Sequence, residues 1–317
     1  MKAAVYRSYG DPEVVQVKQM AIPKVGAHDV LIRVQATTVT AGDWRMRRAD
    51  PFVIRLMNGL RAPKQQVLGH EFAGTVEAVG DQVIQFAPGD AVYGSTGFAA
   101  GAHATYVCVA ANGALARIPA GLTMAEAASV PVGALTALHF LQKAQVEVGH
   151  RVLIYGASGS IGTAAVQLAK HMGADVTAVC STRNIALVKE LGADAVVDYT
   201  KHDYASLETM YDVIFDTVGK SSYWQARRVL AAGGTYVASS PGIGDYLQLV
   251  WVNRFSTHRI VAGMAKETPD ALQHISDLIA QGQYAPVIDR RYPMYQIVEA
   301  HRYAESGHKR GNVVIEL

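Results

Sequence analysis

The sequence predicts an α/β protein that combines a β-rich part with a doubly wound parallel sheet. The chain has 317 residues, enough for about two domains. Short strand-like runs separated by turn residues fill roughly the first 120 residues, and strands alternate with helices after Thr123. The sequence holds 29 glycines and only 2 cysteines. This ratio favours an enzyme with many tight backbone turns over a fold built on disulfides or thiolate–metal sites.

Composition excludes several classes of protein. Hydrophobic residues make up 50% and charged residues 18%, which excludes a disordered chain. A net charge of +2 is too mild to indicate a nucleic-acid partner. Cys108 and Cys180 can form at most one bridge, so a reducing cytoplasm is expected. The first residues meet charge at once and lack the apolar core of a signal peptide, so none is expected. The weakly charged stretch 127–141 is shorter than the about 20 residues of a membrane span. We therefore expect a cytoplasmic protein with no membrane partner.

The first part of the chain is expected to form a compact β-barrel with little helix. Turn residues such as Pro88 and Gly89 punctuate it. Its strand-like runs are Val14–Val17, Asp29–Val34, Gly74–Val79 and Ala104–Val109.

One segment of this first part, residues 44–64, is locally basic. Asp50 is its only acidic residue against five arginines and Lys64. A nucleic-acid or phosphate surface would need more interleaved aromatic residues than the segment holds. We expect a solvated loop or helix face here.

The second part alternates strands and helices, which predicts a parallel sheet. A helix opens at 124–128 and resumes after Pro131 as Ala134–Ala144. The elements that follow are Arg151–Tyr155, Thr163–Met172, Asp175–Cys180, Ile185–Leu191, Ala195–Val197, Val213–Phe215, Ser222–Leu230 and Thr235–Ala238. Two more helices, near 269–281 and 296–307, and a strand at 312–317 complete the chain.

A glycine-rich turn follows the apolar strand Arg151–Tyr155. Ala157, Gly159 and Gly162 occupy the three small-residue positions of a dinucleotide fingerprint, in the variant AxGxxG. The turn leads directly into an Ala-rich helix, whose free N–H groups and dipole favour phosphate. We therefore expect the pyrophosphate of a dinucleotide to bind at Ser158, Gly159, Ser160 and Ile161.

The end of the next strand predicts the type of nucleotide. An NAD site places an acidic residue there to bind the ribose 2′-hydroxyl, and this chain has none between Asp175 and Glu190. Ser181, Thr182 and Arg183 stand there instead, which suits a 2′-phosphate. The predicted cofactor is NADPH.

Several motifs carry a resemblance to the medium-chain dehydrogenase/reductase superfamily along essentially the whole chain. Besides the AxGxxG turn they are Gly69–Val76, Gly80–Val83, Pro88–Val92, Leu191–Asp194 and Gly311–Val314. The runs Val176–Ser181 and Asp198–Tyr199 are similar to those of the zinc-independent quinone oxidoreductases, including reticulon-4-interacting-protein-like members.

The resemblance implies a GroES-like catalytic domain around an inserted Rossmann domain. The expected ranges are 1–122 with 262–317 for the catalytic domain and 123–261 for the NADP(H) domain. It also implies a homodimer joined through the cofactor domains. Tyr199 matches a tyrosine that contacts the adenosine end in similar proteins, whereas Asn312 replaces a lysine or arginine often found in that stretch.

Catalytic zinc needs three protein ligands and an open position. Zinc-dependent members carry a cysteine where this chain has Thr40, and a further Cys or Asp near 130–133 that this chain lacks. His70-Glu71 is the one part of the set that remains. No metal site is expected, and His70 is interpreted as a hydrogen-bonded residue of the cleft.

Without zinc, we expect NADPH to reduce a quinone or an α,β-unsaturated carbonyl compound, because both spread the charge that follows hydride attack. Thr40, Asp43 and Tyr93 are the candidate catalytic residues, with Trp44 and His70 as further cleft residues. Four more cofactor contacts are expected at the carboxyl ends of later strands: Thr217, Val218, Ser239 and Ser240.

Two alternatives remain at this point. One is a zinc-type alcohol dehydrogenase with unusual ligands. The other is an NADPH-binding regulatory protein with little catalysis.

Overall fold

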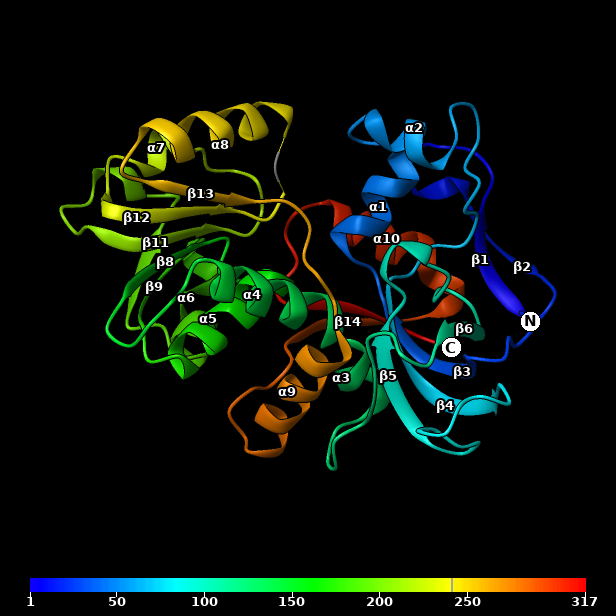
Figure 1. Ribbon diagram of the computed structural model, residues 1–317. Helices are drawn as coiled ribbons and strands as arrows, with labels where there is room; N and C mark the ends of the chain where they lie inside the picture. The colour runs from blue at the N-terminus through cyan, green and yellow to red at the C-terminus, as the bar shows by residue number, and fades with distance from the viewer. Residues whose placement is uncertain (241) are drawn as a thin grey trace. The chain divides into compact units, whose positions relative to one another are not determined.

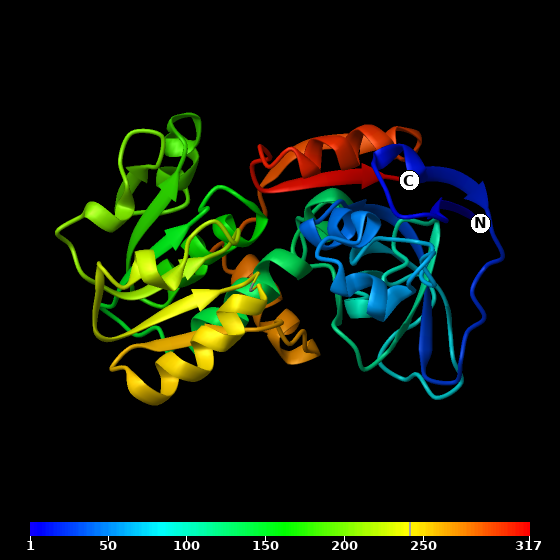
Figure 2. The ribbon, with the colours of Figure 1, turned by 90° about the horizontal axis from the view of Figure 1, so that it is seen from above.

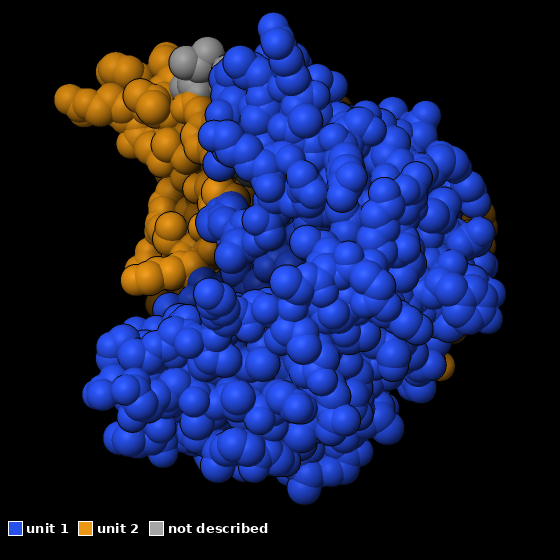
Figure 3. Space-filling view, turned by 90° about the vertical axis from the view of Figure 1, so that its right-hand side faces the viewer, with its two compact units in different colours: residues 1–132, 267–281, 286–317 blue, residues 133–266, 282–285 orange. Residues whose placement is uncertain are grey.

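The computed structural model describes residues 1–240 and 242–317. The chain divides into two compact units, which Figure 3 colours blue and orange. Unit 1 comprises residues 1–132, 267–281 and 286–317, and unit 2 comprises residues 133–266 and 282–285. The first two boundaries between the units follow residues 132 and 266, whereas the expected domain boundaries followed residues 122 and 261. Helix α3 (Met124–Ala128) explains the first shift, because it packs on strands of unit 1.

Unit 2 is built on a six-stranded sheet in the order β10-β9-β8-β11-β12-β13, with every adjacent pair parallel. The strands are β8 (Arg151–Tyr155), β9 (Asp175–Cys180), β10 (Ala195–Asp198), β11 (Tyr211–Asp216), β12 (Leu230–Ala238) and β13 (Arg259–Ala262). The chain runs outward from β8 to β10 and then crosses to β11 on the other side. This reversal creates a switch point between β8 and β11, where ligands bind in open α/β sheets. The predicted doubly wound sheet is confirmed.

Helices cover both faces of this sheet (Figure 1). They are α4 (Pro131–Lys143), α5 (Ser160–His171), α6 (Ile185–Glu190), α7 (Tyr223–Ala226) and α8 (Ile243–Phe255). Buried apolar residues such as Leu153, Ile214 and Tyr236 form part of the core. The sequence pattern did not predict α8 or β13. Helix α8 was missed because Val250, Trp251 and Phe255 are exposed, so it lacks the usual polar outer face.

Unit 1 contains a seven-stranded, mainly antiparallel sheet. Six strands follow the order β14-β15-β3-β4-β5-β7, β6 pairs with β3, and β1 and β2 form a separate pair. The strands are β1 (Lys2–Tyr6), β2 (Val15–Gln19), β3 (Asp29–Thr38), β4 (Glu71–Val79), β5 (Ala91–Ser95), β6 (Tyr106–Ala110), β7 (Leu115–Arg117), β14 (Ile288–Pro293) and β15 (Asn312–Glu316). β3 pairs with β4, with β6 along its first half and with β15 at its end. The GroES-like barrel is thereby confirmed, completed by the C-terminal strands.

Unit 1 holds more helix than predicted. Besides α3 it contains α1 (Ala41–Arg48), α2 (Val53–Asn58), α9 (Pro269–Ala280) and α10 (Ile297–Glu305). Helix α10 lies beside β15 (Figure 2). Helices α1 and α2 fall inside the part predicted to hold little helix, and both overlap residues 44–64, where a solvated loop or helix face was expected. Across the described residues, no helix combines the length and apolar character needed to cross a bilayer.

Candidate active site and dinucleotide site

The glycine-rich turn of unit 2 joins β8 to α5. Gly156 has a φ of +80°, a left-handed conformation that favours glycine. The N–H groups of Gly156 and Ala157 both donate to the Val179 carbonyl at 3.1 Å, which ties the turn to β9. Gly159 is the N-cap residue of α5 and offers no side-chain cap. The first N–H groups of α5 therefore keep their capacity to bind an anion.

Glycine is favoured at positions 162 and 159 of the fingerprint for different physical reasons. A Cβ on Gly162 would lie 2.2 Å from the Gly156 carbonyl oxygen, so the fold itself requires glycine there. A Cβ on Gly159 would meet only the Gly156 oxygen at 3.5 Å, which is ordinary contact. The space in front of Gly159 is therefore not needed for packing within the chain. It is the close-approach position of a pyrophosphate cradle.

A buried amide links this turn to the end of β9. Asn184 Nδ2 donates to Ser158 Oγ at 2.8 Å and to Ser181 Oγ at 3.2 Å. Its Oδ1 is buried and has no hydrogen-bond partner among the residues that the structure describes. Asn184 was not among the predicted residues, because its role depends on two turns that meet only in the folded chain.

The residues predicted for the 2′-phosphate lie together at the carboxyl ends of β9 and β10. Thr182 Oγ1 donates to the Asp198 carboxylate, whereas Arg183 and Tyr199 are exposed. Asp198 also accepts two hydrogen bonds from Thr200. The Thr182 hydroxyl therefore holds the two strand ends together.

The loop after β11 is shaped by a buried carboxylate. Asp216 accepts hydrogen bonds from the N–H groups of Val218, Gly219 and Ser221 at 2.8–3.0 Å. Thr217 Oγ1 donates to the Tyr155 carbonyl at 2.9 Å, and Ser239 Oγ donates to the Asp216 carbonyl at 3.0 Å. These loops meet at the carboxyl ends of neighbouring strands beside the switch point.

The donor set of unit 2 fits a dinucleotide. Three features lie in one βαβ unit: a helix N-terminus without a side-chain cap, a turn with space in front of Gly159, and a buried amide oxygen with no partner in the described part of the chain. Ser158, Gly159, Ser160 and Ile161 would hold the pyrophosphate there.

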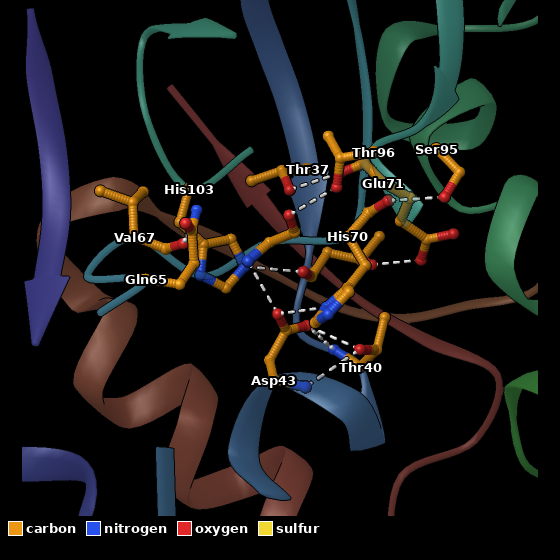
Figure 4. Close-up of polar contacts among 12 residues, drawn as sticks. Thr37, Thr40, Asp43, Gln65, Val67, His70, Glu71, Ser95, Thr96 and His103 are labelled. Carbon is orange, nitrogen blue, oxygen red and sulfur yellow. Dashed lines mark hydrogen bonds and ion pairs between the residues drawn. The ribbon is translucent and has the colours of Figure 1, made fainter. Parts of the chain in front are cut away.

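In unit 1, Thr40 and Asp43 form the N-terminal capping box of α1 (Figure 4). Asp43 Oδ2 accepts from both the backbone N–H and the Oγ1 of Thr40 at 2.7 Å. Asp43 Oδ1 accepts from the Gly69 N–H at 2.7 Å. The carboxylate is completely buried, and its position is fixed from several sides.

His70 contacts the same carboxylate, with Nδ1 2.8 Å from Asp43 Oδ1. Burial opposes a charge on the ring, but the Asp43 carboxylate outweighs it and raises the pKa of His70. Burial likewise opposes the charge of Asp43, but His70, His103 and Thr40 lower its pKa well below the usual range. The His70 side chain is 14% exposed, and its Nε2 forms no hydrogen bond among the described residues. The pair therefore holds a proton at Nδ1 and leaves Nε2 for a ligand.

Glu71 points away from this pair into another network. Its carboxylate accepts from Thr38 Oγ1 and, at 2.7 Å, from the Val132 N–H in the first turn of α4. Burial raises the pKa of Glu71 to about 7. Glu71 thus joins Thr38 at the end of β3 to the Val132 N–H within unit 1.

A second carboxylate, Glu267, lies near His70. Its carboxylate is within hydrogen-bond distance of the Ser95 hydroxyl, which also lies 3.0 Å from the His70 carbonyl and can donate its one proton to either oxygen. Burial raises the pKa of Glu267, and His70 partly offsets this effect. Glu267 was not predicted from sequence, since it stands far from Ser95 along the chain.

The residues present do not fit a catalytic zinc. His70 Nδ1 is committed to Asp43, the Thr40 hydroxyl donates to the same carboxylate, and Glu71 accepts from the Val132 N–H. No group of three or more His, Cys, Asp or Glu residues in the described part of the chain could hold a metal ion.

Tyr93 was expected to line the catalytic cleft, but it lies elsewhere. It is completely buried in unit 1, and its hydroxyl lies 2.6 Å from Ser276 Oγ in α9. A side chain in that position packs the core and does not reach substrate. Trp44 is partly buried and packs against the apolar cluster around α10. Asn312 is also structural, since its Nδ2 donates to the carbonyls of Ser129 and Val287.

The fold and the two donor sets define a nicotinamide-dependent oxidoreductase of two domains. Residues 26–138 match the model of the alcohol dehydrogenase GroES-like domain, and residues 191–315 match that of the zinc-binding dehydrogenase. The chain belongs to the medium-chain dehydrogenase/reductase superfamily, in its quinone oxidoreductase group, as its motifs predicted.

Individual relatives agree with this assignment. The 2-methylene-furan-3-one reductase of Solanum lycopersicum is 32% identical, with 99% of this chain and 79% of the relative covered. The chloroplastic NADPH-dependent alkenal/one oxidoreductase of Arabidopsis thaliana is 30% identical with the same coverage. The solved quinone oxidoreductase from Coxiella burnetii has a TM-score of 0.91 and 30% identity, with 100% of this chain and 99% of that chain covered.

Proposed function

We propose that the protein reduces quinones or α,β-unsaturated carbonyl compounds with NADPH, and that His70 donates the proton. The names of the relatives support this substrate class, since they describe a methylene-furanone reductase, an alkenal/one oxidoreductase and a quinone oxidoreductase. The observation that carries the proposal is the Asp43–His70 pair. It presents one ring nitrogen to the exterior and anchors the other on a buried carboxylate.

The reaction needs one hydride and one proton. Bound NADPH supplies the hydride, and residues 158–161 would hold its pyrophosphate. When a hydride adds to a conjugated carbon, negative charge develops on the substrate oxygen, and a donated proton neutralises it. His70 Nε2–H donates that proton, and the Asp43 carboxylate stabilises the ring and fixes its orientation. Solvent then restores the proton through the exposed edge of the ring.

The other predicted catalytic residues act through His70. Asp43 is completely buried and Thr40 is 8% exposed, so both are positioning residues rather than substrate contacts. The Thr40 hydroxyl is bonded to Asp43, which removes it as a donor to substrate. Tyr93 is left out of the catalytic set.

NADPH is preferred over NADH in this proposal. Arg183 stands at the end of β9 with no acidic residue between Asp175 and Glu190. The neighbouring acid, Asp198, already accepts hydrogen bonds from Thr182 and Thr200. A 2′-phosphate would meet the Arg183 guanidinium rather than a free carboxylate.

The decisive experiment follows NADPH oxidation with a panel of quinones and enones in the wild type, His70→Asn and the surface control His28→Asn. Loss of one proton donor should lower kcat about 100-fold in His70→Asn, with NADPH affinity unchanged, while His28→Asn behaves as wild type. The raised pKa of His70 keeps it protonated above its usual range, so wild-type kcat should fall as pH rises past that value. Asp43→Asn should move this fall to lower pH.

Other outcomes would reject the proposal. Tight NADPH binding without turnover of any acceptor would favour a regulatory binding protein. Stoichiometric zinc in active protein, with oxidation of simple alcohols, would favour a zinc-type alcohol dehydrogenase. A His70→Asn variant with wild-type kcat and pH profile would remove His70 from the mechanism but would leave the substrate class intact.

The chain is further proposed to form a homodimer through unit 2. Strand β13 lies at the end of the sheet order, and Trp224, Val250, Trp251 and Phe255 are exposed apolar residues of the α7 and α8 layer. An open strand edge beside such a surface favours pairing with another copy. A monomeric mass in sedimentation equilibrium at micromolar concentration would reject it. A cytoplasmic location also stays a prediction.

A further inference from the structure

The short helix α2 and its flanks expose an unusual set of apolar side chains. They are Phe52, Val53, Leu56, Met57 and Leu60, and each is 46% to 71% exposed. Within α2, Val53 and Met57 are spaced four apart, so they lie on the same side of the helix. Phe52 is its N-cap residue, and Leu60 follows its end at Gly59. Single exposed apolar residues are ordinary, but five within nine consecutive residues are an unusual local concentration of apolar surface. We call residues 52–64 the α2 surface.

The inner side of this segment is polar. Asn58 is buried; its Nδ2 donates to the Tyr6 hydroxyl at 3.0 Å, and its Oδ1 accepts from the Gln65 N–H at 2.9 Å. The Tyr9 hydroxyl donates to the Gly59 carbonyl at 2.8 Å. A surface helix normally turns its apolar residues to the core and its polar residues to solvent. In α2 the one buried residue is the polar Asn58, whereas Leu56 and Met57 are exposed, so these two apolar side chains face solvent.

The same segment also carries cations. Arg55 lies over the Tyr9 ring, Arg61 and Lys64 are exposed, and Asp50 is the only acid from residue 44 to 64. Arg47 and Arg48 of α1 do not add to this charge in the same way, because both pair with Glu305 of α10. The α2 surface therefore combines apolar residues with a local excess of positive charge.

We propose that the α2 surface docks the protein on an anionic lipid bilayer, with the apolar side chains in the interface and the cations at the headgroups. Amphipathic segments of this composition lie in the plane of a membrane surface, and anionic lipids attract the adjacent basic residues. A second copy of the chain suits the patch poorly, since a two-fold contact would bring its cations together. The sequence pattern predicted a solvated face and no membrane partner. The exposed apolar residues of the α2 surface favour a membrane partner instead.

This inference does not depend on catalysis, so the two can be tested apart. Purified full-length protein is sedimented with phosphatidylcholine vesicles and with vesicles containing 30% phosphatidylglycerol. The wild type should bind the anionic vesicles at low ionic strength and be released by salt. Leu56→Ser with Met57→Ser should weaken binding about tenfold. Arg61→Ala with Lys64→Ala should weaken it roughly 25-fold, at about fivefold for each cation near the surface.

Matched controls distinguish the α2 surface from general stickiness. Ile84→Ser removes an apolar side chain that is 94% exposed elsewhere in unit 1, and Lys189→Ala removes an exposed cation of unit 2. Neither should change vesicle binding. Circular dichroism and turnover of a short, water-soluble quinone verify that each variant folds and is active.

Three results would overturn the inference: no binding of the wild type, equal binding to neutral vesicles, or unchanged binding in both α2 variants. A rise in KM for long-tailed quinones in the Leu56/Met57 variant, without vesicle binding, would also overturn it. That result would indicate that the α2 surface binds the hydrophobic tail of the quinone substrate.

Discussion

The two donor sets of this protein are built in opposite ways. In unit 2 the dinucleotide site depends on backbone conformation and on room for the ligand. It consists of a helix N-terminus without a side-chain cap, Gly156 in a left-handed conformation and an open position at Gly159. In unit 1 the site is made of side chains that fix one another, with Asp43 accepting from Thr40, Gly69 and His70. A backbone site fails when a side chain is added, and a side-chain site fails when one is removed. The two should therefore respond differently to substitution.

Asp43→Ala should have the largest effect on folding. It removes a completely buried acceptor and leaves the N–H groups of Thr40 and Gly69 without their partner. Loss of about 3 kcal/mol or more in the free energy of unfolding is expected. Urea denaturation at pH 7 measures it. Asp43→Asn keeps the volume and one acceptor and should lose less. Equal stability of Asp43→Ala and wild type would show that the pair does not hold the site.

The glycine turn should separate folding from binding. Gly162→Ala places a Cβ 2.2 Å from the Gly156 carbonyl oxygen and should cost about 3 kcal/mol of stability. Gly159→Val should fold normally, because that position is open, but should weaken NADPH binding about 30-fold by blocking the cradle. Thermal unfolding and fluorescence titration with NADPH measure the two effects. Wild-type affinity in a folded Gly159→Val protein would contradict the assignment of the cradle.

Glu71 should make stability depend on pH. Its folded pKa of about 7 lies above the usual value of 4.5, so the folded state binds more protons than the unfolded state between these values. This contribution is fully present below pH 4.5 and is lost as pH rises through 7. Glu71→Gln mimics the protonated form. The wild type should lose about 2 kcal/mol relative to Glu71→Gln between pH 5 and 8. Urea titrations at each pH measure the difference, and parallel curves for the two proteins would reject it.

The same contrast explains what the sequence could predict. The parallel sheet, the AxGxxG turn and the barrel depend on local patterns, so they were readable from strand spacing and glycine positions. The capping box of Thr40 and Asp43 was also visible as a local pair, although its structural role was not recognised. At residues 44–64 the sequence left a loop and a helix both open, because the exposed residues of α2 are apolar and do not follow the usual surface pattern.

The side-chain site could be predicted only in part. Glu267 reaches Ser95 from a distant segment, and buried Asn184 joins two turns, so neither had a local signal. Burial also decided which predicted residues could act. Thr40, Asp43 and Tyr93 have suitable chemistry, but their surroundings turn the first two into supports for His70 and the third into core.

Tyr93→Phe should have the smallest effect and tests this last distinction. The hydroxyl of Tyr93 meets Ser276 Oγ, which also donates to the Leu272 carbonyl of α9 at 3.0 Å, so Ser276 keeps a partner in the variant. Removing one buried hydrogen bond should cost about 1 kcal/mol of stability. Because the residue is completely buried, kcat and its pH profile should stay at wild-type values. Urea denaturation and quinone turnover measure the two quantities on the same preparation. A fall in kcat of tenfold or more at unchanged stability would return Tyr93 to the catalytic set.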